Sequence, residues 1–110
     1  MPFQVLLTRS AASDLDEICD YLERHRGPER VRRLLDRLER ALRGLADLPH
    51  RGGYPIELSS LGVHDYRQVF LGSYRVIYQV MDDSVYVLLI ADARRDMQTL
   101  LQRRLLRPRR

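Results

Sequence analysis

The sequence contains a single cysteine, Cys19, and neither lysine nor tryptophan among its 110 residues. One cysteine cannot form an internal disulfide, so packing must stabilise the chain, and Cys19 is predicted to be a small buried residue in a helix. No apolar run approaches the ~20 residues that span a bilayer. The start lacks the basic and long apolar segments of a signal peptide. We therefore expect a cytoplasmic protein with no membrane partner.

Sequence motifs for several common chemistries are also missing. There is no glycine-rich phosphate loop, no Cys/His cluster with metal-ligand spacing, and no recognisable Ser–His–acid set. His50 and His64 are isolated in the sequence and are predicted to be surface histidines. We therefore expect no metal and no cofactor.

Basic charge is carried only by arginine and is unevenly distributed along the chain. Nineteen arginines and 15 acids give a formal net charge of +4. Residues 1–96 carry fourteen arginines against all fifteen acids, whereas residues 97–110 carry five arginines and no acid. The excess therefore belongs to the C-terminal segment, which ends in a basic tail at about 107–110. Such a tail either holds nucleic acid or an acidic partner, or is a solvated chain end.

Three predicted strands follow one another at residues 66–71, 74–81 and 84–91. They are rich in β-branched and aromatic residues and are separated only by Gly72-Ser73 and Asp82-Asp83. Turns of two residues predict an antiparallel meander, in which Leu71 faces Tyr74 and Met81 faces Ser84. Since opposed residues share a face and side chains alternate, this register assigns each side chain to one of two faces.

One face of this sheet is rich in valine and the other is mixed. The valine-rich face, which we expect the helices to cover, carries Arg67, Val69, Leu71, Tyr74, Val76, Tyr78, Val80, Val85, Val87, Leu89 and Ala91. The mixed face carries Tyr66, Gln68, Phe70, Arg75, Ile77, Gln79, Met81, Tyr86, Leu88 and Ile90. We expect the mixed face to be open and place a working surface there. One added residue in the first turn would exchange the faces of the first strand.

The remaining segments complete a predicted α+β fold. Residues 3–8 read as an edge strand, and apolar residues at helical spacing predict helices at about 11–25 and 28–46, joined as an antiparallel hairpin. Thr8 or Ser10 can cap the first helix, and Asp96 a short C-terminal helix of two or three turns. We thus expect one domain, residues 1–110, with an N-terminal strand, a helical hairpin on one face of a mainly antiparallel sheet, and a short C-terminal helix.

Two segments in this scheme allow more than one interpretation. The second helix carries a series of arginines outside its apolar stripe, which could contact nucleic acid, although such a face is more often simply solvated. Residues 48–64 are long enough for a functional loop. Three apolar residues of this linker are expected to tuck against the core: Ile56, Leu58 and Leu61.

Arginines on and beside the mixed face are the candidate anion-binding groups. Arg75 lies in mid-sheet, and Arg94 and Arg95 follow the last strand. Guanidinium groups bind phosphate bidentately and stay charged, so they could anchor RNA or stabilise a phosphorane-like transition state. The structural alternative is that Arg75 pairs with a carboxylate such as that of Asp92.

Several short motifs occur in a characteristic order along the chain. They are Leu7-Thr8, Ala12, Asp14-Leu15, Ile18 and Tyr21 near the start, then Tyr74-Arg75-Val76-Ile77-Tyr78-Gln79-Val80, and finally Arg94-Arg95-Asp96. Together with the order of the predicted elements, they resemble the RelE/ParE superfamily of toxins from bacterial toxin–antitoxin systems. The resemblance implies a cytosolic, growth-inhibiting toxin of the kind involved in plasmid stabilisation. It also implies a hetero-oligomer with a small antitoxin whose acidic C-terminal arm wraps the toxin.

The resemblance leaves two activities open. RelE-like members cut mRNA on the ribosome without metal, and by position Arg75 and Arg95 match their two arginines. The catalytic tyrosine of those members falls on Leu101, and a histidine found at the strand exit falls on Asp92. A good proton donor or acceptor is then missing. ParE-like members instead inhibit DNA gyrase by binding, and the long helical hairpin resembles that branch.

Gyrase inhibition by binding is therefore the preferred prediction. The alternatives are a ribosome-dependent endoribonuclease with Arg75 and Arg95 as catalytic residues, and an interaction module with decayed toxicity. The predicted target-binding residues are Tyr66, Arg67, Gln68, Arg75, Gln79, Tyr86, Asp92, Arg94 and Arg95.

Overall fold

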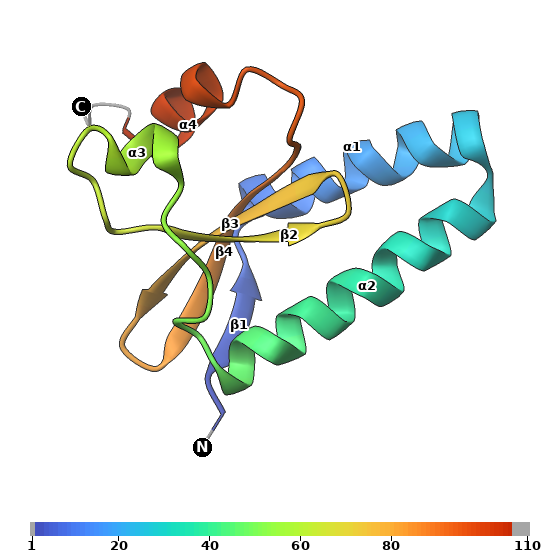
Figure 1. The fold of residues 1–110 in the computed structure, drawn as a ribbon. Coiled ribbons are helices and arrows are strands. Elements are labelled where there is room, and N and C mark those ends of the chain that lie inside the picture. Colours follow the sequence, from blue (N-terminus) through green and yellow to red (C-terminus); the bar gives the residue numbers. More distant parts are fainter. Residues whose placement is uncertain (1, 107–110) are drawn as a thin grey trace.

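A computed structural model, which describes residues 2–106, shows a four-stranded sheet with helices on both faces (Figure 1). The strand order is β1-β4-β3-β2. Strand β1 (Gln4–Leu7) pairs in parallel with β4 (Ser84–Asp92), while β2 (Arg67–Leu71), β3 (Tyr74–Met81) and β4 form an antiparallel meander. The predicted α+β fold and the edge position of the N-terminal strand are confirmed. The predicted tail at 107–110 lies outside the described residues.

The helical hairpin consists of α1 (Arg9–Arg26) and α2 (Pro28–Asp47). Thr8 caps α1, because its Oγ1 accepts a hydrogen bond of 3.2 Å from the backbone N–H of Ala11. Gly27 then separates the helices with φ of 93°, and Pro28 begins α2. Both helices pack their apolar stripes against the valine-rich face of the sheet, as predicted.

The meander has the predicted register at both turns but contains a bulge in β4. Leu71 pairs with Tyr74 and Met81 pairs with Ser84, as expected. Further along, Tyr78 pairs with Val87 but Ile77 pairs with Leu89, so one residue of β4 is extra.

The bulge corrects the predicted faces at the end of β4. Ile90 packs with the hairpin core, whereas Leu89 and Ala91 lie in the cluster on the opposite face. The prediction for these three residues was wrong because the last strand is almost continuously apolar, so its hydrophobic pattern cannot reveal an inserted residue.

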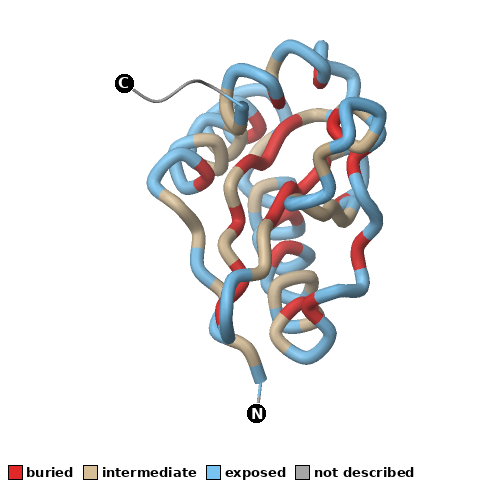
Figure 2. The backbone as a smooth tube through the Cα atoms, turned by 90° about the vertical axis from the view of Figure 1, so that its left-hand side faces the viewer, coloured by how far each residue is buried: buried red, intermediate tan, exposed pale blue. Residues whose placement is uncertain are grey.

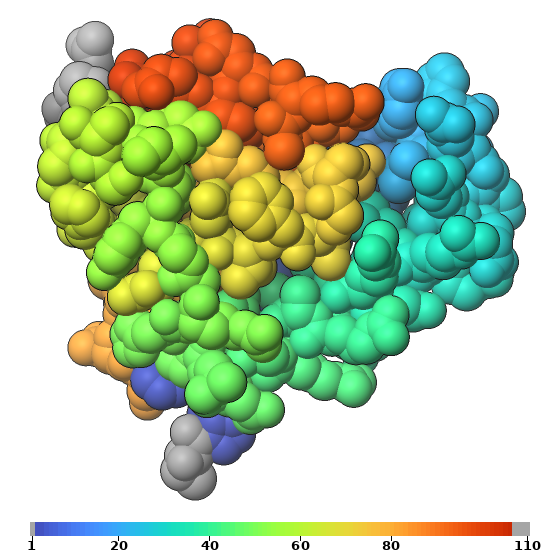
Figure 3. Space-filling model, viewed as in Figure 1, coloured from blue at the N-terminus to red at the C-terminus, as the bar shows by residue number. Residues whose placement is uncertain are grey.

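The mixed face is covered, which contradicts the expectation that it is open. Helices α3 (Ile56–Ser59) and α4 (Met97–Leu105) lie over it (Figures 1 and 3). The side chains buried beneath them are Leu58, Ile77, Leu89, Ala91, Met97 and Leu101. Since the bulge turns two further apolar side chains onto this face, leaving it in water would be unfavourable. The cluster is a second hydrophobic core, separate from the one beneath the hairpin.

The linker between α2 and β2 is pinned along the edge of the sheet. The backbone N–H of Gly52 donates to the buried hydroxyl of Tyr78 at 3.0 Å, and the N–H of Gln68 donates to the carbonyl of Gly53 at 2.8 Å. Leu58 is fully buried as predicted. The expectation that Ile56 and Leu61 would also tuck in was wrong, because they are 68% and 53% exposed.

Helix α4 is tied to the hairpin across the bulge. Asp96 caps α4 as predicted, accepting from Thr99 N–H at 3.2 Å. Arg104 donates to both carboxylate oxygens of Asp14 at 3.1 and 3.0 Å, and to the carbonyl of Leu88 at 3.0 Å. This contact joins α1, β4 and α4, so it holds the second core against the sheet.

Burial is concentrated in the strands and on the inward sides of the helices (Figure 2). Cys19 is half-buried beside the hairpin core, and burial raises the pKa of its thiol. Among residues 2–106, no helix combines the length and the apolar character required to cross a bilayer.

Candidate functional site

Arg75 is buried and fully engaged in the middle of the covered face. Its side chain donates from both terminal nitrogens to the two carboxylate oxygens of Glu57, each at 2.8 Å, and from Nε to Gln68 Oε1 at 2.8 Å. These hydrogen bonds lower the pKa of the Glu57 carboxyl. The structural alternative, a carboxylate partner for Arg75, is thus confirmed, but the partner is Glu57 on α3 and not Asp92. The sequence did not indicate Glu57 as the partner of Arg75, because the pattern of the linker does not show which part of the sheet the linker packs on.

The other target-binding residues predicted on the sheet are also held by neighbours, although Arg67 lies on the hairpin face, opposite to Arg75. Arg67 donates to the carbonyls of His50 at 3.2 Å and Gly52 at 2.8 Å, and its guanidinium carbon lies 4.6 Å from the ring centre of Tyr54. Tyr66 packs against the second core, and burial raises its pKa. Gln79 and Tyr86 are half-buried partners across β3 and β4. The sheet therefore offers no continuous open polar surface here.

Both histidines of the linker lie on the surface, as predicted. His50 and His64 are exposed, and the His64 ring meets the ring of Tyr54 edge-on with centroids 5.1 Å apart. Among the described residues, no group of three metal-ligating side chains comes together.

Asp92 and Arg94 form a local ion pair where β4 ends. Asp92 accepts from the backbone N–H and Nε of Arg94, each at 2.9 Å, and from Nη2 at 2.6 Å. These contacts lower the pKa of Asp92 to about 2. Arg95 is exposed beside them. Asp92, Arg94 and Arg95 all line the cleft described below, whereas Arg75 does not.

A cleft of about 870 Å³ lies between the helical hairpin, the β2–β3 turn and the end of β4 (Figure 3). Its apolar lining comes from both helices and from the strands: Ile18, Leu22, Leu34, Leu71 and Ile90. Arg95 lines this cleft, whereas Arg75 does not. The two arginines proposed for ribonuclease chemistry are therefore not part of one pocket.

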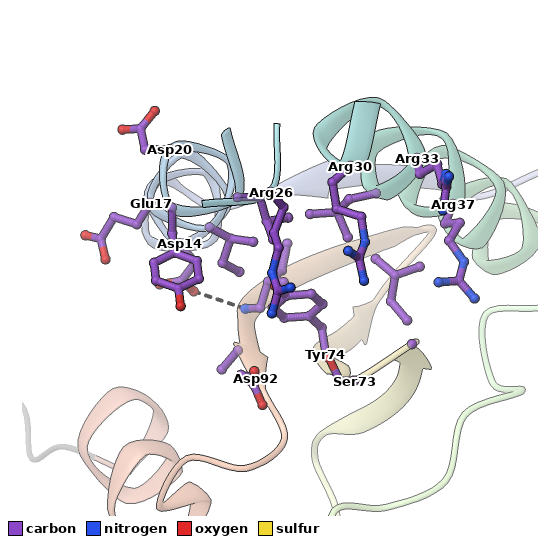
Figure 4. Close-up of a pocket in the computed structure, with 18 of the residues that line it drawn as sticks. Asp14, Glu17, Asp20, Arg26, Arg30, Arg33, Arg37, Ser73, Tyr74 and Asp92 are labelled. Carbon is purple, nitrogen blue, oxygen red and sulfur yellow. Dashed lines mark hydrogen bonds between the residues drawn. The ribbon is translucent and has the colours of Figure 1, made fainter. Parts of the chain in front are cut away.

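Arginines from the hairpin gather on one side of the cleft (Figure 4). Arg30, Arg33 and Arg37 of α2, which we call the arginine wall, are all exposed. Arg37 also lies against the β2–β3 turn, where a Cβ added to Gly72 would come within 3.2 Å of its Nη1. The sequence showed the arginines of this helix, and their three- and four-residue spacing is the signal that places these three together.

The charge that remains unpaired in the cleft is positive. Of the seven arginines that line it, only Arg94 has an ion-pair partner within residues 2–106. Of its four acids, Asp14 is bound to Arg104 and Asp92 to Arg94. Six unpaired arginines thus face two unpaired acids, Glu17 and Asp20, which leaves a net charge of +4. An apolar lining beside a cationic wall suits an amphipathic, acidic ligand.

Comparison with known proteins agrees with this architecture. A family model described as "ParE toxin of type II toxin-antitoxin system, parDE" matches residues 5–97. Among solved structures, one from the chromosomal ParDE toxin–antitoxin system of P. aeruginosa is 22% identical, covers 82% of this chain and 95% of that chain, and has a TM-score of 0.67. One from the RelBE2 toxin–antitoxin complex of Mycobacterium tuberculosis is 24% identical, covers 84% and 92%, and has a TM-score of 0.59.

These two structures show a shared fold. No curated protein sequence matches the chain significantly. The family model, however, spans most of the chain. This chain therefore belongs to the ParE toxin family of type II toxin–antitoxin systems, within the RelE/ParE superfamily.

Proposed function

We propose that this toxin arrests growth in the cytoplasm by binding DNA gyrase, and not by cleaving RNA. The main observation that supports the proposal is the burial and pairing of Arg75. The residue is 6% exposed, and its guanidinium already binds Glu57 and Gln68, so it is not free to bind a scissile phosphate. Membership of the ParE family supports the same choice.

The residues at the strand exit also argue against ribonuclease chemistry. Activation of a 2′-hydroxyl requires a general base that accepts a proton near neutral pH. Asp92 occupies the relevant position, but its pKa of about 2 makes it a poor base. Arg95 lines the cleft and Arg75 does not, so a phosphate bound in the cleft would meet Arg95 without Arg75.

We further propose that a small antitoxin neutralises the chain by covering the cleft in a hetero-oligomer. One of the two similar structures comes from a ParDE toxin–antitoxin system and the other from a RelBE2 toxin–antitoxin complex. An acidic arm would pair with the unpaired arginines and cover the apolar lining of the cleft. Co-purification of the chain with a short acidic protein would support this proposal. A chain that does not bind such a protein would contradict it.

The direct test of the target is a gyrase supercoiling assay with purified toxin. We expect supercoiling to be inhibited and to recover when antitoxin is added. Full supercoiling at excess toxin would contradict the proposal. In induced cells, filamentation with DNA damage supports gyrase as the target, cleaved transcripts with intact DNA support the ribonuclease, and normal growth supports a module with decayed toxicity.

A double variant separates binding from chemistry without breaking the fold. Arg75→Met alone would leave Glu57 unpaired, so Glu57→Leu is combined with it, and apolar replacement of a whole buried ion pair is often neutral for stability. We expect the double variant to keep its toxicity and gyrase inhibition. A ribonuclease that used Arg75 would lose ~100-fold or more of its activity. Unfolding in urea verifies that the variant is folded.

A further inference from the structure

We propose that the arginine wall binds the phosphate backbone of DNA, so that the toxin contacts the DNA held by gyrase as well as the enzyme. This inference rests on the proposed function, because it places the toxin where gyrase holds its substrate. The ligand class is double-stranded DNA recognised through its phosphates and not through its bases.

The charges of α2 are separated into paired and unpaired groups. Arg32 is bonded to Glu29, and Arg43 donates to Glu39 at 2.9 Å, so these two arginines are neutralised on the outer side of the helix. Within residues 2–106, Arg30, Arg33 and Arg37 have no ion-pair partner. Arg40 also has no ion-pair partner within these residues but does not line the cleft. The three arginines of the wall are thus the unpaired arginines of α2 that border the cleft.

The geometry of the row suits a series of phosphates. Spacings of three and seven residues place the three side chains ~5 and ~10 Å apart along the helix. Figure 4 shows Arg30 and Arg37 pointing toward the β2–β3 turn, with Arg26 beside them. Each exposed guanidinium presents a fork of donors that matches a phosphate group. The three exposed guanidinium groups therefore form a surface that can bind successive phosphates.

The acids near the cleft do not cancel this surface. Glu17 and Asp20 project from the opposite side of α1, away from the arginine wall (Figure 4). Asp14 and Asp92 are already paired with arginines. An acidic antitoxin arm in the cleft would occupy the same guanidinium groups, so neutralisation would also block the contact with DNA.

The test measures binding of the antitoxin-free toxin to a fluorescent 20-base-pair duplex by anisotropy, over a range of salt concentrations. The variant Arg30→Gln/Arg33→Gln/Arg37→Gln removes the wall. The control Arg32→Gln/Arg43→Gln/Arg103→Gln removes the same net charge from exposed positions outside the cleft. We expect the wall variant to bind DNA at least ~10-fold more weakly at low salt. The slope of log K against log salt concentration should fall in magnitude by ~2.7, since three phosphate contacts are lost. The control variant should bind nearly as well as the unchanged chain.

Three results would overturn the inference. The first is no binding of the unchanged toxin to DNA at low salt. The second is an equal loss in both variants, which would mean that only net charge matters. The third is a wall variant that keeps its DNA affinity but no longer binds the acidic antitoxin, which would assign the wall to a protein partner alone.

A parallel gyrase assay distinguishes failure of this inference from failure of the proposed function. Suppose that the unchanged toxin fails to bind DNA and the wall variant still inhibits gyrase fully. The DNA contact would then be refuted, and gyrase would remain the target. An unchanged toxin that binds DNA through the wall but leaves supercoiling intact removes gyrase as the target and keeps the DNA contact.

Discussion

Glu57 and Arg75 form an ion pair with little access to water, their side chains being 17% and 8% exposed. Removing a charge from water is costly, and the cost is offset only by a partner with good geometry. The bidentate contact provides that geometry, and Gln68 Oε1 accepts further hydrogen bonds from Nε and Nη2. The main effect of the pair is therefore to fix the position of α3 over the sheet, and its net contribution to the free energy of unfolding is small.

Glu57→Ala should strongly destabilise the chain, because it leaves the Arg75 guanidinium buried without a counter-charge. We expect a loss of ~3–5 kcal/mol in the free energy of unfolding, measured by urea denaturation. Glu29→Ala is the matched control, since it breaks an exposed pair with Arg32 and should cost less than ~1 kcal/mol. Similar losses in the two variants would show that Arg75 has water or another partner available.

The same pair should make stability depend on acid pH. Hydrogen bonds from Arg75 lower the pKa of the Glu57 carboxyl in the folded chain. Its contribution is therefore complete above the unfolded pKa of ~4.3 and is lost as the pH falls through the lower folded value. We expect the stability difference between the unchanged chain and Glu57→Gln to shrink as the pH falls below ~4. Urea titrations across this range measure it, and a difference that stays constant would argue against the pairing.

At the scale of elements, the linker is the segment that converts an exposed sheet face into a second core. Its path depends on Gly52, where the backbone passes close to β2 and Tyr78. The bulge in β4 acts in the same direction, since it turns Leu89 and Ala91 toward α3 and α4. These two features together explain why the polar residues of this face are not available to a target.

Gly52→Ala should destabilise the linker, whereas Gly53→Ala should not. A Cβ at Gly52 would lie 2.4 Å from the carbonyl oxygen of Gln68, while a Cβ at Gly53 meets nothing within 4 Å. Since the clashing atom belongs to the backbone, we expect a cost of ~1–3 kcal/mol for the first change and little for the second. Urea denaturation of both variants measures the difference. Equal stabilities would mean that the linker can move away from β2 freely.

At the scale of the molecule, the sheet separates two cores and leaves the cleft at its end. The hairpin core lies on one face and the smaller core under α3 and α4 on the other. The hairpin extends past the β2–β3 turn (Figure 1). The cleft lies between these two segments and the end of β4. A partner in this position would contact α1, α2 and the sheet together, so its binding would also stabilise their arrangement.

Binding of the antitoxin should therefore raise the thermal stability of the toxin. A partner present at ~100 times its Kd adds ~2.7 kcal/mol, which corresponds to a rise in Tm of ~10 °C or more for a domain of this size. Calorimetry of the toxin with and without antitoxin measures this shift. The Arg30→Gln/Arg33→Gln/Arg37→Gln variant should show a smaller rise. An identical rise would mean that the antitoxin binds elsewhere.

Local patterns determined most of the secondary structure. The two-residue turns set the register of the meander, Thr8 and Asp96 cap their helices, and apolar periodicity predicted the hairpin on the valine-rich face. Each of these signals acts between residues that are neighbours in the chain or within one strand pair, so it can be read without the fold.

The tertiary structure alone decided which charges are free. Arg75 meets Glu57 across 18 residues, and Arg104 meets Asp14 across 90, so nothing in the local sequence shows that these groups are occupied. The arginines of α2 were visible in the sequence, but only the packing of the hairpin against the sheet left three of them unpaired beside a cleft. Pairing in a folded chain depends on distance in space, and a sequence pattern gives only distance along the chain.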